Sequence, residues 1–130
     1  MKQVSIGSAQ QFQPRQIVCL EHEHTCLYAE VIEVVSARQV CWVRPLMLVS
    51  PANNQSLPFS SSEDIVLYDL RQGSDLLWPT SLFRPALDTE VISLLGQLQN
   101  PDTSSVNNLD APKQLRSFVN QVWQAYKSAF

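Results

Sequence analysis

The stretch LYAEVIEVVSARQVCWVRPLMLV, residues 27–49, decides the fold that we expect for this chain. Its two apolar runs, residues 27–35 and 40–49, are rich in Val, Ile, Tyr and Trp, which suit a pleated, half-buried surface. Only Ser36–Gln39 separates them, and a connection that short joins antiparallel neighbours. The sequence therefore predicts a β-hairpin at the centre of the fold.

The first strand of this hairpin is apolar on both faces. Side chains alternate along a strand, so even-numbered residues from Tyr28 to Val34 are expected on one face and odd-numbered residues from Leu27 to Val35 on the other. Such a strand is typical of a small barrel or of a sheet covered by helices. In the second strand, Pro45 cannot donate a ladder hydrogen bond, which predicts a kink, a bulge or a sheet edge there.

Three shorter apolar runs flank the hairpin and extend the predicted β region over residues 14–78. They are residues 16–21, 65–70 and 76–78, and a polar loop rich in Pro, Asn and Ser fills residues 50–64. We therefore expect a small antiparallel, SH3-like β-barrel of about five strands.

Two helices are predicted after the β region, at residues 88–98 and 111–129, with a loop over residues 99–110. The first has Asp88 or Thr89 as a candidate cap and apolar residues at helical spacing. The second has the clearest periodicity in the chain, carried by Leu115, Phe118, Val119, Val122, Trp123 and Tyr126. The expected fold class is α+β, with residues 1–130 forming a single domain.

The composition of the chain argues against several classes of function. Nine Lys and Arg against twelve Asp and Glu give a net charge of −3, which lacks the basic footprint of non-specific nucleic-acid binding. No apolar segment is long enough to span a membrane, and residues 1–13 lack the apolar core of a secretory signal. The three cysteines, Cys19, Cys26 and Cys41, are an odd number, which predicts reduced thiols in the cytoplasm.

No catalytic or cofactor motif is found, so a non-enzyme without a cofactor is expected. The three glycines are too sparse for a phosphate-binding loop, and no G-x-S-x-G elbow occurs. In EHEHTC, the residues His22, His24 and Cys26 would share one face of an extended strand and could bind zinc. A solvated hairpin tip without metal is the interpretation that we prefer.

The candidate partner-binding residues lie in DLRQGSDLLWPTSLFRPALD, residues 69–88. This segment breaks both strand and helix periodicity, and it combines Arg71, Trp78, Phe83 and Arg84, residue types enriched at binding hot spots. The alternative is that Trp78 and Phe83 fill the core and that Arg84 pairs with Asp88.

Three segments resemble small cyanobacterial proteins that have no known activity: YAEVIEVV (28–35), CWVRPLML (41–48) and DLLWPTSLFRPALDTEVISLL (75–95). The β region also resembles an SH3-like barrel, but it lacks the glycine turn and basic surface of the RNA-binding members. We expect a non-catalytic adaptor or an assembly or regulatory factor that binds another protein. The alternative is an RNA-binding accessory protein. The C-terminal helix could instead pair with a second copy in a homodimer.

Overall fold

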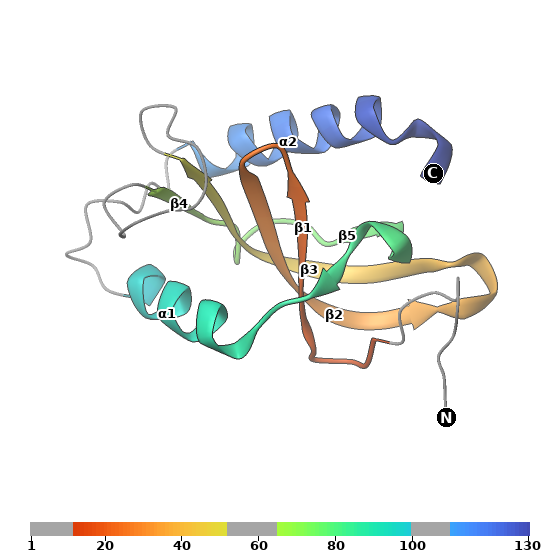
Figure 1. The fold of residues 1–130 in the computed structure, drawn as a ribbon, viewed down its shortest axis with the longest axis horizontal. Coiled ribbons are helices and arrows are strands. Elements are labelled where there is room, and N and C mark those ends of the chain that lie inside the picture. The colour runs from red at the N-terminus through yellow and green to blue at the C-terminus, as the bar shows by residue number, and fades with distance from the viewer. Residues whose placement is uncertain (1–11, 52–64, 100–109) are drawn as a thin grey trace.

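A computed structural model describes residues 12–51, 65–99 and 110–130. Six strands and two α-helices lie in these ranges (Figure 1): β1 (Ile17–His22), β2 (Thr25–Val35), β3 (Val40–Pro51), β4 (Ile65–Asp69), β5 (Leu76–Pro79), β6 (Arg84–Pro85), α1 (Asp88–Gln99) and α2 (Ala111–Ala125). Short 3-10 turns, η1 (Ser36–Arg38), η4 (Thr80–Leu82) and η5 (Lys127–Ala129), complete them. The expected α+β class is confirmed.

The strands form one antiparallel sheet in the order β4-β3-β2-β1-β6, with β5 paired to β3. The central β2–β3 hairpin is confirmed, with Val35 opposite Val40 at its closed end. After β5, the η4 turn carries the chain from the β3 edge to the opposite edge, where β6 pairs with β1. Among the described residues no ladder joins β6 to β4 or β5, so the sheet is open.

A β-bulge lies beside Pro45, as the sequence predicts. Ala29 pairs with Pro45 while Tyr28 pairs with Met47, so Leu46 is an extra residue in β3. The missing N–H of the proline accounts for the break in regular pairing at this point.

The neighbouring edge of the sheet is interrupted at the same place. β4 ends with Asp69 opposite Met47, and β5 begins with Leu76 opposite Val43. β4 and β5 are therefore two parts of one strand that runs along β3, and residues 70–75 leave the sheet between them. The departing turn is held by Leu70, whose N–H donates to the Leu46 carbonyl at 3.0 Å.

A second bulge changes the predicted face of Val34. Val31 pairs with Val43 and Glu33 pairs with Trp42, which leaves Ile32 as the extra residue of β2. Beyond the bulge the alternation reverses, so Val34 packs against the core that α2 covers. The expectation that Val34 shares a face with Tyr28 is wrong, because strict alternation holds only while pairing stays in register.

One helix covers each face of the sheet (Figure 1). α2 packs through Phe118 and Val122 on the core that includes Val18, Leu27 and Val43. On the opposite face α1 covers a second core through its two buried residues, Val91 and Leu98. That second core includes Cys19, Cys26, Tyr28, Met47 and Leu67. The N-terminal half of β2 is apolar on both faces because each face is covered by a helix there.

The first helix begins at Asp88, the first residue of its predicted range, but a different residue caps it. The Leu87 carbonyl accepts a hydrogen bond from the Val91 N–H at 3.0 Å, and the Leu87 N–H donates to the Glu90 carboxylate at 2.8 Å. Leu87 is therefore the cap, and the expected role of Asp88 or Thr89 is wrong. The Glu90 carboxylate supplies the reciprocal half of a capping box, and this bond favours Leu87 as the capping residue.

The second helix matches the predicted start, with Asp110 as its cap and Pro112 in its first turn. It ends at Ala125, and the η5 turn replaces the last predicted helical turn. Trp123 and Tyr126 sit at the margin of the apolar stripe, with exposed fractions of 42% and 38%.

Candidate binding site

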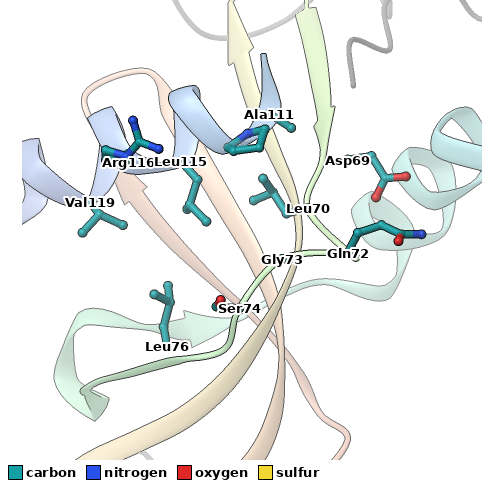
Figure 2. A pocket seen from close by; sticks show the side chains of 11 residues that line it. Asp69, Leu70, Gln72, Gly73, Ser74, Leu76, Ala111, Leu115, Arg116 and Val119 are labelled. Atoms are coloured by element: carbon teal, nitrogen blue, oxygen red, sulfur yellow. The ribbon is translucent and has the colours of Figure 1, made fainter. Parts of the chain in front are cut away.

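A pocket lies where the chain leaves the sheet between β4 and β5, under the first turns of α2 (Figure 2). Its volume is about 640 Å³. The pocket exists because residues 70–75 depart from β3 opposite Pro45, so the apolar face of α2 that passes over this gap has no strand to pack against.

The walls of the pocket are apolar side chains from both sides of the gap. Figure 2 shows Leu115 and Val119 pointing from α2 toward Leu70 and Leu76. Leu115, Val119 and Leu76 are only partly buried, which leaves part of each side chain facing the pocket. A ligand that entered would cover apolar surface that the protein itself leaves accessible to water.

The rim is polar and its turn is held in place. Asp69 accepts hydrogen bonds from the Arg71 backbone N–H at 3.0 Å and from its guanidinium at 2.9 Å. The Arg71 guanidinium holds the pKa of the Asp69 carboxyl below its usual range. The Gly73 N–H donates to the Leu70 carbonyl at 3.0 Å. Gln72, Ser74 and Arg116 complete the polar part of the lining.

The structure places two of the four predicted partner-binding residues in the core. Trp78 and Phe83 have exposed fractions of 7% and 3%, so the alternative that they fill the core is correct. The Trp78 ring packs edge-on against Phe130 at 5.4 Å between centroids. Trp78 lies in β5, and Phe83 follows the η4 turn that leads to β6.

The two predicted arginines do not meet. Arg71 follows β4 at one edge of the sheet, whereas Arg84 lies in β6 at the other. Arg84 donates to Glu21 at 2.8 Å and to Glu90 at 3.1 Å, so the expected pairing with Asp88 is wrong. No single surface therefore collects the four residues, and their role in partner binding stays a prediction for Arg71 and Arg84 alone.

Glu90 is the centre of a polar network at the start of α1. Its carboxylate accepts hydrogen bonds from the Tyr28 hydroxyl at 2.8 Å, from Arg84 and from the Leu87 N–H. Burial raises the pKa of Glu90, but these donors outweigh it and hold the pKa below its ordinary value. Burial, above all, raises the pKa of Tyr28. The network ties β2, β6 and α1 together.

The cysteines behave as apolar core residues. All three are buried free thiols. The neighbouring Cys26 and burial raise the pKa of the Cys19 thiol, and burial raises the pKa of Cys41. A thiol with a raised pKa stays protonated at neutral pH, which makes it a poor nucleophile.

The turn in EHEHTC separates its metal-ligand candidates. The chain reverses at Glu23 and His24, so His22 pairs with Thr25 and the alternation expected of an extended strand is broken. His22 packs edge-on against the Tyr126 ring on the α2 face, whereas Cys26 lies in the core under α1. In residues 12–51, 65–99 and 110–130 no group of three or more His, Cys, Asp or Glu could hold a metal ion.

The pocket residues Leu115 and Val119 belong to the predicted apolar stripe of the second helix. The sequence does not show that they lie over the gap between β4 and β5 in the sheet. That gap depends on where β4 and β5 pair along β3.

Comparison of the chain with models of protein families, with curated proteins and with solved structures finds no match in any of the three. Within the part of the chain that the structure describes, neither helix has the length and apolar character needed to cross a membrane.

Proposed function

We propose that this protein is a non-catalytic, cytoplasmic binding module, an adaptor or assembly factor, that captures a segment of another protein in the pocket between the β4–β5 turn and α2. The observation that carries the proposal is the pocket itself, about 640 Å³ with walls from Leu70, Leu76, Leu115 and Val119. Pockets that bind ligands span about 300–1,000 Å³ and combine apolar walls with a few polar groups.

The size and lining of the pocket favour apolar side chains of a partner as the occupant. The volume exceeds what one aliphatic side chain fills, so two or three neighbouring side chains of a partner segment would fit. Asp69, Gln72, Ser74 and Arg116 at the rim offer hydrogen bonds to the backbone of that segment. The Asp69–Arg71 pair fixes the turn beforehand, which lowers the entropy lost on binding.

The strand order supports an SH3-like architecture for this module. β6 follows the η4 turn and pairs back on β1, next to the β1–β2–β3 meander. The three buried free thiols suit the reducing compartment that we propose for it.

To test this proposal, the full-length protein is used to select peptides from a random peptide display library. The binding site of the selected peptides is then mapped by methyl NMR. We expect peptides with adjacent apolar anchors that shift the Leu70, Leu115 and Val119 methyl signals. Leu115→Gln should weaken their binding at least about tenfold, which is the order expected when an apolar anchor loses its contact. The matched control is Gln121→Glu, at an exposed position further along α2.

Selected peptides that leave these methyl signals unshifted would refute the pocket as the binding site. The same titration with single-stranded RNA addresses the alternative function. If RNA shifts the pocket signals at physiological salt and no selected peptide does, the result would favour RNA binding over protein binding as the function of the pocket.

A further inference from the structure

The sheet has a second exposed region, on the face opposite the pocket. The core under α1 contains the N-terminal half of β2 and the C-terminal half of β3, represented by Cys26, Tyr28, Met47 and Val49. The other half of this face is not covered by α1, because the β2–β3 hairpin extends well beyond the helix (Figure 1).

The uncovered half presents five side chains from three neighbouring strands, which we call the Trp42 face. Strand register places them in two rows, Glu33–Trp42–Leu77 and Glu30–Arg44. Trp42 and Leu77 are cross-strand partners with exposed fractions of 40% and 54%. Single exposed apolar residues are ordinary, but two large ones directly opposite each other on neighbouring strands bring their apolar surfaces together.

The indole ring of Trp42 is held in a fixed orientation. Its Nε1–H donates to Asp75 Oδ2 at 2.8 Å, and the Arg44 Nε donates to Asp75 Oδ1 at 3.2 Å. These two bonds hold the pKa of the Asp75 carboxyl below its usual range. The indole edge is thus occupied by a carboxylate, while part of the ring remains exposed to solvent.

Within the two rows of the Trp42 face, the charges that remain once the internal pair is removed are negative, and Arg38 lies beyond these rows, in a neighbouring pocket that Leu77 also lines. Arg44 is neutralised by Asp75. Glu33, directly across from Trp42, and Glu30, directly across from Arg44, have no hydrogen bond or ion pair with any other described residue. A cation is attracted both to the face of an indole ring and to nearby carboxylates.

We propose that the Trp42 face binds a Lys- or Arg-bearing segment of a partner protein, with the cation over the Trp42 ring beside Glu33 and an adjacent apolar side chain against Leu77. Charge complementarity selects this occupant, because two unpaired carboxylates border the ring. The Trp42 face and the pocket lie on opposite faces of the sheet and share no lining side chain, although Asp75, which holds the Trp42 ring, lies between the pocket residues Ser74 and Leu76.

The test uses a blocked peptide, Gly-Lys-Leu-Lys-Gly, and matched peptides in which Glu or Gln replaces both Lys. Binding to the full-length protein is followed by heteronuclear NMR through the Trp42 indole N–H signal, which is assigned by its absence in Trp42→Phe. We expect the Lys peptide to shift the Trp42 indole and Leu77 amide signals, with an affinity that falls as salt is added. The Glu peptide should leave both signals unshifted.

Three variants separate this site from general attraction to an acidic protein. Trp42→Leu keeps an apolar side chain but removes the ring, and it should weaken binding about two- to five-fold. The double variant Glu30→Gln/Glu33→Gln should also weaken binding, whereas Glu23→Gln, an exposed acid in the β1–β2 turn, should not. Should Trp42→Leu fail to fold, Trp42→Phe keeps an aromatic face and should bind within about twofold of the parent protein.

Equal shifts from the Lys and Glu peptides would overturn the proposal, as would an equal loss of affinity in Glu23→Gln. Leu115→Gln distinguishes the two sites, because it should leave Lys-peptide binding unchanged. If it abolished that binding, the peptide would be occupying the pocket and the Trp42 face would be excluded.

Discussion

At the scale of single residues, Glu90 holds several elements of the fold in place. It caps α1, accepts the Tyr28 hydroxyl and pairs with Arg84. Its side chain is partly buried, with an exposed fraction of 26%, whereas the Arg84–Glu21 pair is about 40% exposed on both sides. Hydrogen bonds to a buried carboxylate contribute more than a solvated ion pair.

Glu90→Gln should therefore lower the free energy of unfolding by about 1–2 kcal/mol, because the neutral amide replaces charge-assisted hydrogen bonds. Urea denaturation followed by tryptophan fluorescence measures the change. Glu21→Gln is the control and should cost less than about 1 kcal/mol, since that pair is exposed. Equal losses in the two variants would contradict the central role of Glu90.

The same residue predicts a pH dependence. The pKa of Glu90 is lower in the folded protein than its ordinary value of 4.5. The ionised carboxylate therefore adds stability above the unfolded-state pKa, and this contribution is lost as pH falls through the folded-state pKa. Between about pH 5 and pH 3, the unfolding free energy of Glu90→Gln should fall less steeply than that of the parent protein. If the unfolding free energies of the two proteins fell in parallel with pH in a series of denaturation experiments, the pH dependence would not come from Glu90.

At the scale of elements, α2 is fixed by a few side chains rather than by its whole apolar stripe. Phe118 and Val122 have exposed fractions of 3% and 0%. Trp123 and Tyr126 continue the helical spacing but reach the margin, where Trp123 packs on Phe130 at 4.9 Å. The margin residues contribute less because water keeps access to them.

Phe118→Ala should cost about 3–5 kcal/mol, since it removes a fully packed aromatic side chain. Trp123→Ala should cost less than half of that, although the residue is larger, because 42% of its surface is already exposed. Thermal unfolding of both variants measures the two losses of stability and shows which is larger. A larger cost for Trp123→Ala would mean that this side chain has a further contact in solution, such as a second copy of the chain.

At the scale of the whole molecule, the two helices on opposite faces leave two exposed regions, the pocket and the Trp42 face. Both arise where a helix and a strand do not overlap. The pocket lies where a strand departs beneath α2, and the Trp42 face lies where β2 and β3 extend beyond α1. The apolar stripe of α2 packs on its own sheet, and dimerisation through this helix stays a prediction.

The net charge of −3 predicts negligible affinity for bulk DNA or RNA at physiological salt. Neutralising several phosphates at once needs clustered Lys and Arg, whose counterion release drives non-specific binding. A gel shift with mixed-sequence DNA and RNA tests this expectation. Micromolar binding that weakens steeply with added salt would reveal a basic patch formed by the fold.

The sequence by itself determined most of the elements and the α+β class, but not which face of the sheet each helix covers. The β2–β3 hairpin, the bulge beside Pro45 and the amphipathic α2 all follow from local patterns, because periodicity and proline chemistry act over a few residues. Only the tertiary structure decided the pairing of Arg84 with Glu21 and Glu90, the burial of Trp78 and Phe83, and the gap that forms the pocket. Each of these depends on the register between strands distant in the sequence. A single extra residue at Ile32 or Leu46 reverses the faces beyond it. Pro45 marks a break near Leu46, but no local pattern records the extra residue at Ile32.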